Sequence, residues 1–239
     1  MHAPVVSAFV LAGGESSRMG RDKALLVLPT GETLLARALS TAKMIANTVM
    51  LVAADVRYAE TTEVRIVRDV YRGCGPLAGI HAALSASATE LNVVLGVDCP
   101  LVTPELLRFL VRVAAGTDKL ATVPRVAGHL HNVCAVYRKE FANIAEKVLA
   151  GNAAPPRQAK DRLAGNPTFT PARANPAQVG EMDIADGKRH GTRIDCLFTE
   201  TPCRIVEEDE LRAAGFGAEL FANVNTPEDF TALTLRMQP

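Results

Sequence analysis

The chain has 239 residues, of which 48% are hydrophobic, so it can bury a core of the size found in one large α/β domain. Lysine plus arginine and aspartate plus glutamate number 26 each, and this balance argues against a nucleic-acid partner or a membrane-surface patch. The longest apolar runs are strand-sized, which excludes a membrane-spanning helix, and the first residues lack the features of a signal peptide.

The cysteines form no CxxC pair and leave an odd number, which is typical of a reducing compartment rather than of a disulfide framework. They are Cys74, Cys99, Cys134, Cys196 and Cys203. A structural zinc site needs more closely paired ligands, so none is expected. We therefore expect a cytoplasmic protein.

Strand and helix signals alternate through the first ninety residues. Continuous apolar runs indicate buried strands, and apolar residues at helical spacing indicate amphipathic helices. The predicted elements are a strand over 5–11, a helix over 31–46, strands over 48–53 and 64–67, and a helix over 77–88. The last helix follows Pro76, a residue suited to a first helical turn.

The same alternation continues after residue 90. The predicted elements are a strand over 91–97, a helix starting at Thr103, Pro104 and Glu105, strands over 121–126 and 131–137, a helix over 138–150 closed by Gly151, and a helix that starts at 225–228. A hydroxyl cap, a proline and an acid are the favoured residues at a helix start. A glycine commonly ends one.

Alternating strands and helices predict an α/β fold with a mostly parallel sheet covered by helices on both faces. Ligands of such sheets bind at the carboxyl ends of the strands, so the loop at 11–25, Asp98 and the region of Asp69 are expected on one edge. Residues 152–202 break the alternation and are rich in proline, alanine and arginine. They form either a functional lid or a surface insertion in one domain over 1–239, and the surface insertion is the preferred interpretation.

The loop LAGGESSRMGRDKAL at 11–25 contains more glycines, hydroxyls and cations than a turn requires. It matches neither a Walker A motif nor GxGxxG. The amides of Gly13 and Gly14, the Arg18 guanidinium and the Lys23 ammonium would together suit a triphosphate. The alternative is an ordinary solvated loop.

Three other segments carry candidate ligands. Asp98 ends a buried strand with no lysine close in sequence, which suits Mg²⁺ held together with substrate phosphates, although the carboxylate could equally cap a turn. Asn223 or Asn225 would add an amide oxygen to this region. The glycines at 69–84, Gly75 among them, allow a base or ribose to approach the backbone, or simply form a strand-to-helix turn.

We expect no catalytic role for Cys99 or for the pair His129 and His131. No histidine is placed by the sequence to activate Cys99, so we do not expect a nucleophile there. His129 and His131 alternate on an expected strand without a third ligand, which favours ordinary edge or core residues.

Four motifs in chain order resemble the nucleotidyltransferases with a GT-A-like, Rossmann-like fold, and specifically the molybdenum cofactor guanylyltransferases. They are LAGG, RMG and DKALL within 11–26, Asp69 with GPLAG at 75–79, Asp-x-Pro at 98–100 and NVNTPED at 223–229. The resemblance covers the chain except for about 152–202. It implies a three-layer α/β fold with a mostly parallel sheet.

The resemblance also implies roles for individual residues. The backbone of Leu11, Ala12 and Gly13 would contact a guanine nucleotide, which Lys23 and Asp69 would also bind. Asp98 would bind Mg²⁺, with Asn225 close to the metal or to the second substrate. Members of the family usually have asparagine where this chain has Asp55, so one base or ribose contact is in question at that position.

The implied reaction joins GTP and molybdopterin phosphate, free or loaded with molybdenum, into a guanine dinucleotide and pyrophosphate, with Arg18, Lys23 and Asp98 as catalytic residues. A cytidylyltransferase acting on the same cofactor is the closest rival, but those enzymes tend to have LAAG and lack GPLAG. A sugar-phosphate nucleotidyltransferase and a non-catalytic nucleotide-binding module are further alternatives. Neither nucleic acid nor membrane is expected as a partner, while transient contact with proteins of cofactor biosynthesis or with acceptor proteins is allowed. The insertion is longer than is usual in the family, and one hypothesis is that it covers the pterin substrate.

Overall fold

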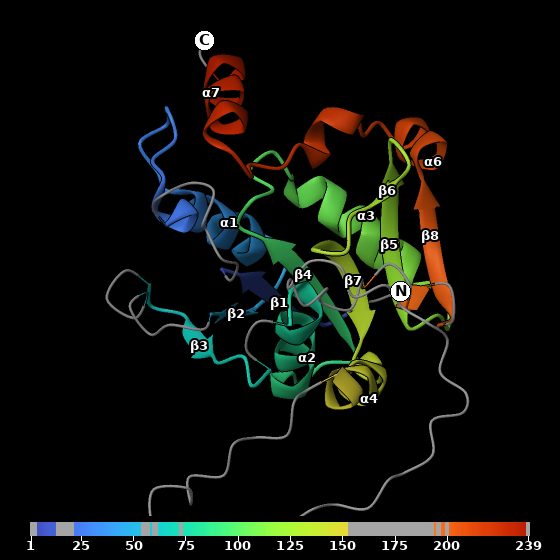
Figure 1. The fold of residues 1–239 in the computed structure, drawn as a ribbon. Helices are drawn as coiled ribbons and strands as arrows, with labels where there is room; N and C mark the ends of the chain where they lie inside the picture. Colours follow the sequence, from blue (N-terminus) through green and yellow to red (C-terminus); the bar gives the residue numbers. More distant parts are fainter. Residues whose placement is uncertain are drawn as a thin grey trace, which may run out of the picture.

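The computed structural model describes residues 4–12, 22–53, 58, 62–71, 74–152, 194, 197–198 and 201–237. In these ranges eight strands form one sheet in the order β3-β2-β1-β4-β7-β5-β6, with β8 paired to β5 (Figure 1). The strands are β1 (Val6–Leu11), β2 (Thr48–Val52), β3 (Arg65–Val67), β4 (Leu91–Gly96), β5 (Ala121–Val126), β6 (His129–Leu130), β7 (Cys134–Arg138) and β8 (Cys203–Glu207).

The pairing is mixed, with a parallel half that matches the sequence-based prediction. Strand β1 runs parallel to both β2 and β4, β2 is parallel to β3, and β5 is parallel to β8. Strand β7 is antiparallel to β4 and β5, and β6 is antiparallel to β5. The carboxyl ends of β1 to β4 therefore lie on the same edge of the sheet.

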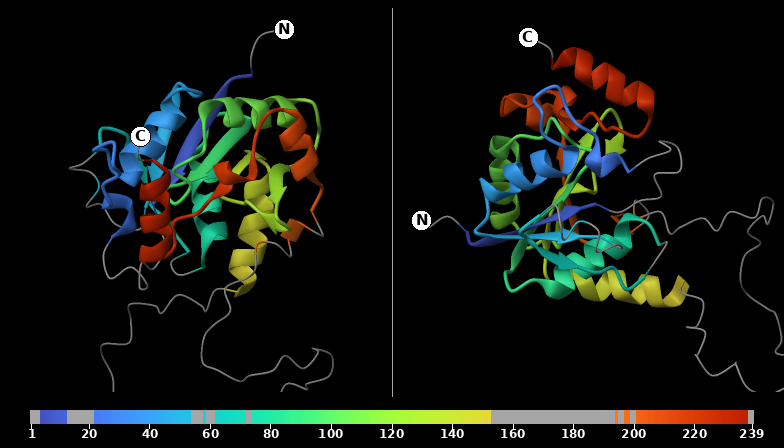
Figure 2. Two further views of the ribbon diagram at one scale, coloured as in Figure 1. Left: turned by 90° about the horizontal axis from the view of Figure 1, so that it is seen from above. Right: turned by 90° about the vertical axis from the view of Figure 1, so that its left-hand side faces the viewer.

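Helices cover both faces of the sheet, as Figure 2 shows, so the predicted three-layer α/β architecture is confirmed. Helices α1 (Leu34–Lys43) and α3 (Pro104–Ala115) pack on one face, and α2 (Pro76–Ala86) and α4 (Phe141–Asn152) pack on the other. In the central strand β1, Ala8 and Val10 face the first layer while Phe9 and Leu11 face the second. Because both of its faces are buried, β1 is apolar along almost its whole length.

The C-terminal part crosses back over the edge that carries the strand ends. It contains α6 (Glu208–Ala213), the short 3-10 helix η4 (Ala218–Phe221) and α7 (Pro227–Arg236). Helix α7 packs through Leu233 against Leu26, Leu28 and Leu34, which form a third, small core with Val224. A second 3-10 turn, η2 (Lys23–Leu25), lies beside this small core. No helix in the described part of the chain is long and apolar enough to cross a membrane.

Two sequence-based expectations need correction. The helix predicted over 138–150 begins at Phe141 and runs through Gly151 to Asn152, so Gly151 does not end it. Gly151 has no left-handed φ, which a C-terminal glycine cap requires. Strand β8 and helices α6 and η4 were not predicted.

The expected insertion at 152–202 lies largely outside the described residues. Near its end, Ile194, Leu197 and Phe198 are buried at 6–8% exposure and pack in the core beneath α2 and α4. These three residues therefore contribute to the hydrophobic core and are not a surface elaboration.

Candidate active site

Asp98 lies at the centre of the edge, two residues beyond the end of β4. The Val97 amide still donates to the Leu11 carbonyl at 3.1 Å, which keeps the start of this turn next to β1. A Cβ atom on Gly96 would lie 2.3 Å from Oδ1 of Asp98 and 3.0 Å from Cγ2 of Val133. The carboxylate can therefore adopt its position only because residue 96 has no side chain.

The side chain of Lys23 extends toward Asp98 from the 3-10 turn η2. It is the first residue of η2, and the Asp22 carboxylate caps this turn by accepting the Ala24 amide at 3.1 Å. The Tyr58 hydroxyl, on a residue that is 3% exposed, donates to the other oxygen of Asp22 at 2.7 Å. The turn that carries Lys23 is thus held to the body of the protein by a buried tyrosine.

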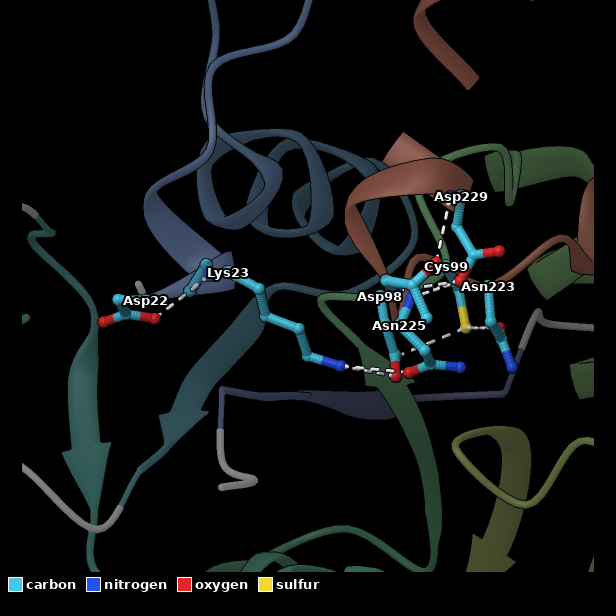
Figure 3. Close-up of polar contacts among 9 residues, drawn as sticks. Asp22, Lys23, Asp98, Cys99, Asn223, Asn225 and Asp229 are labelled. Atoms are coloured by element: carbon cyan, nitrogen blue, oxygen red, sulfur yellow. Dashed lines mark hydrogen bonds and ion pairs between the residues drawn. The ribbon is translucent and has the colours of Figure 1, made fainter. Parts of the chain in front are cut away.

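The two charged groups meet. Nζ of Lys23 lies 3.0 Å from Oδ2 of Asp98 and also donates to Oδ1 of Asn225 at 3.4 Å (Figure 3). The Lys23 and Asp98 side chains are 17% and 20% exposed, so the pair is partly shielded from water. No lysine lies close to Asp98 in the sequence, and the fold supplies Lys23 from 75 positions away, on the edge where both residues are expected.

Asn225 is positioned by the start of α7. The Val224 amide donates to the Asp98 carbonyl at 2.9 Å, which fastens this segment to the end of β4. The Asp229 carboxylate accepts the amides of Asn225 and Thr226, and the Thr226 hydroxyl accepts the Asp229 amide, which completes a capping box. The hydrogen bond from the Asn225 amide lowers the pKa of Asp229 from its ordinary value. The backbone amide and the side chain of Thr226 lower it further.

Cys99 has a structural role beside the site. Its Sγ donates to Oδ1 of Asn223 at 3.1 Å, which links the turn after β4 to the segment before α7. Burial raises the pKa of the Cys99 thiol well above its ordinary value, and the Asp98 carboxylate adds to this effect. A buried, protonated thiol is a poor nucleophile, in agreement with the sequence-based reading.

Of the other candidate residues, Leu11, Ala12 and Asp69 lie in the described part of the chain. The Leu11 carbonyl and the Ala12 amide are used within the sheet, by Val97 and by the Val52 carbonyl, so nucleotide contacts from this pair would need their other backbone atoms. Asp69 lies just after β3 on the expected edge, where its carboxylate accepts the Tyr71 amide at 2.8 Å.

Gly75 caps α2 with φ of 70°, a conformation for which glycine is favoured. The candidates Gly13, Gly14, Arg18 and Asp55 lie outside the described residues.

The oxygen atoms at this edge suit a hard divalent cation. Mg²⁺ in nucleotide enzymes is held by one or two carboxylates together with substrate phosphates and water. Asp98 and Asn225 already share one cation, the Lys23 ammonium, so their oxygens converge on a point that a positive charge occupies. The described residues contain no group of three or more His, Cys, Asp or Glu side chains that could hold a metal ion. A metal at Asp98 and Asn225 would take its remaining ligands from water or from a bound substrate.

Sequence reasoning missed three residues that shape this site. Gly96 stands two positions before Asp98, and a glycine at the end of a buried strand is the signal that could have identified it. Asp22 could have been identified as a helix cap directly before Lys23. No local sequence pattern indicates the role of Tyr58, because its contact with Asp22 joins residues 36 positions apart.

The MobA-like NTP transferase domain family matches residues 8–163, which is more than half of the chain. The chain belongs to this family. As a MobA-like protein it is a nucleotidyltransferase, and the resemblance drawn from its motifs is confirmed.

Individual relatives agree with this assignment. A protein of Mycobacterium avium (strain 104) named "Probable molybdenum cofactor guanylyltransferase" is 37% identical over 153 residues, which cover 62% of this chain and 77% of that protein. Molybdopterin-guanine dinucleotide biosynthesis protein A from Archaeoglobus fulgidus has the same fold, with a TM-score of 0.71 at 21% identity over 96% of this chain and 97% of that one. A protein of Mycobacterium tuberculosis H37Rv solved in complex with manganese also shares the fold, with a TM-score of 0.57 at 20% identity over 98% of this chain and 100% of that one.

Proposed function

We propose that this MobA-like protein transfers GMP from GTP to the phosphate of molybdopterin, free or loaded with molybdenum, and releases pyrophosphate. The observation that carries the proposal is the convergence of Lys23, Asp98 and Asn225 at the carboxyl edge of the sheet. The name of the Mycobacterium avium relative supports the choice of substrates. We further propose that residues 1–239 act as one cytoplasmic transferase domain with an insertion at about 152–202.

The reaction needs charge neutralisation more than it needs a base. The acceptor phosphate is already an anion near neutral pH, so one of its oxygens can attack the α-phosphorus of GTP directly. A bond forms between that oxygen and the α-phosphorus while the bond from the α-phosphorus to the bridging oxygen breaks, and pyrophosphate leaves with the electron pair. The main obstacle is repulsion between the two anions.

The residues of the edge are suited to reduce this repulsion. Lys23 and Arg18 would bind the triphosphate, hold the α-phosphate in line and stabilise the leaving pyrophosphate. Asp98 and Asn225 would hold a divalent metal, Mg²⁺ in our proposal, which when bound neutralises phosphate charge. The backbone of Leu11, Ala12, Gly13, Gly14 and Gly75 together with Asp55 and Asp69 would bind the rest of the nucleotide.

A panel of nucleotides tests the proposal. The protein is incubated with Mg²⁺ and each nucleoside triphosphate, with and without molybdopterin, while pyrophosphate release is followed and the product is identified by mass spectrometry. Release with GTP only when molybdopterin is present, together with a guanine dinucleotide product, is the expected result. Release with CTP instead would identify the cytidylyltransferase, release that needs a sugar phosphate would identify the third alternative, and no release with any acceptor would favour a binding module.

A further inference from the structure

The Lys23 ammonium occupies the position where the metal of the proposed reaction would bind. Its Nζ lies 3.0 Å from Oδ2 of Asp98 and 3.4 Å from Oδ1 of Asn225, and these are the two side-chain oxygens assigned to the metal. Figure 3 shows the lysine side chain extended from η2 toward both of them. One cation position therefore has two candidate occupants, the ammonium and the divalent ion.

The two oxygens come from separate segments of the chain, the turn after β4 and the start of α7. The absence of a Cβ on Gly96 leaves room for the Asp98 carboxylate at its observed position, and the capping box at Asp229 holds the backbone of Asn225. The backbone of Lys23 is anchored by the cap on Asp22. Its side chain, by contrast, is a flexible four-carbon stem that can turn toward a different anion without moving this frame.

The local charges make the two cations competitors. Asp98 brings a single negative charge, and its carboxylate is the ion-pair partner of the Lys23 ammonium. While the ammonium stays between the two oxygens, this charge is neutralised and an entering divalent cation would meet a like charge within a few ångströms. If phosphates drew the ammonium away, the two oxygens would be released and the phosphates would add ligands of their own.

We propose that Lys23 acts as a placeholder for the divalent cation, so that the metal binds tightly only after a nucleotide triphosphate has drawn the lysine away from Asp98 and Asn225. This proposal rests on the proposed function. It adds an order to the binding events, with nucleotide first and metal second. It also gives Lys23 a role in the nucleotide-free protein in addition to its role at the phosphates.

Metal binding without nucleotide or turnover tests the placeholder role. Mn²⁺ serves as a spectroscopically visible substitute for Mg²⁺, and the free ion is measured by electron paramagnetic resonance. The full-length chain is compared with Lys23→Met, which removes the charge and keeps most of the side-chain length. Lys43→Met, an exposed lysine at the end of α1, is the matched control, and the double variant Lys23→Met with Asp98→Asn shows whether the ion sits on Asp98.

Lys23→Met is expected to bind Mn²⁺ about tenfold or more tightly than the wild type, because a like charge next to the ion is gone. Lys43→Met should match the wild type, and the double variant should lose the gain. Thermal unfolding checks the fold of each variant, and Lys23→Gln repeats the comparison with a polar side chain.

Equal or weaker Mn²⁺ binding by both Lys23 variants would overturn the placeholder role. Wild-type turnover in the nucleotide panel would then leave the transferase proposal standing. Tighter Mn²⁺ binding by the Lys23 variants, combined with no pyrophosphate release from any nucleotide, would support the placeholder role and contradict the transferase proposal. The two proposals can therefore fail separately.

Discussion

Lys23 and Asp98 stand 75 positions apart in the chain, yet Nζ and Oδ2 lie 3.0 Å from each other at the carboxyl edge of the sheet. The parallel arrangement of β1 and β4 explains the contact, because it brings the residues that follow both strands to one edge. A lysine and an aspartate at such an edge can serve the same bound nucleotide.

Gly96→Ala should disable the site while most of the fold remains. The new Cβ would lie 2.3 Å from Oδ1 of Asp98, so the carboxylate must move. A displacement of about 1 Å at a reacting centre can cost about 10²-fold in rate, and a loss of that size is expected in pyrophosphate release. Gly116→Ala at the end of α3, where the nearest atom would be 3.6 Å away, should keep its activity. Wild-type turnover by Gly96→Ala would show that Asp98 does not need its observed position.

Tyr58→Phe should weaken the anchor of Lys23. The variant loses the 2.7 Å hydrogen bond to Asp22, and a bond to a charged group contributes about 1.5–3 kcal/mol. We expect lower stability together with a lower kcat, because Lys23 samples more orientations.

Tyr137→Phe provides the comparison for Tyr58→Phe. Tyr137 lies on β7, and the variant also loses a 2.7 Å hydrogen bond, which the hydroxyl donates to the carbonyl of Asn132 in the turn before that strand. It should lower stability without a matching fall in kcat. Equal effects of both variants on kcat would remove the argument for a positioning role.

Thr226→Ala should lower both stability and turnover. Loss of a helix cap typically costs about 1 kcal/mol, and here the cap also holds the segment of Asn225. Thr33→Ala removes a cap of the same 3.1 Å length from α1 and should cost similar stability with unchanged turnover. Denaturant unfolding and pyrophosphate release on both variants decide the matter, and identical turnover in the two would argue against a role for the cap in placing Asn225.

The stability of the protein should fall as the pH drops below 6.5, partly because of His131. Burial lowers the pKa of His131 from its ordinary value of 6.5, and His129 adds a smaller effect. Protons therefore bind the unfolded chain more readily, so the stability is fully present above pH 6.5 and is lost as the pH falls through the range between the two pKa values.

The ring of His131 packs against Phe221, with 4.8 Å between the two ring centroids. A phenylalanine at position 131 keeps an aromatic ring in this contact but has no group that titrates. His131→Phe should accordingly flatten the loss of stability toward acid, whereas His129→Asn should change it far less. Chemical denaturation at several pH values measures both. An unaltered slope in His131→Phe would mean that another group is responsible.

Much of the fold could be predicted from local patterns. Strands β1 and β4 are apolar because both of their faces are buried, and α3 and α7 start at a threonine followed by a proline. The rule that ligands bind at the carboxyl ends of strands was enough to bring Lys23 and Asp98 together.

The missed features depend on contacts between distant residues. Strand β8 is only five residues long and is stabilised by pairing with β5, where Arg125 lies opposite Glu207 across 82 positions. The contact of Tyr58 with Asp22 and the clearance at Gly96 likewise exist only in the folded chain. No local propensity carries such information.

The most direct test of the central claim is pyrophosphate release from GTP and molybdopterin by Asp98→Ala and by Lys23→Ala. Both groups are preorganised charges, and loss of one such contact commonly costs about 10² to 10³ in rate, so each variant should fall by at least that factor. Turnover close to the wild-type rate in both variants would contradict the assignment of this edge as the site of nucleotidyl transfer.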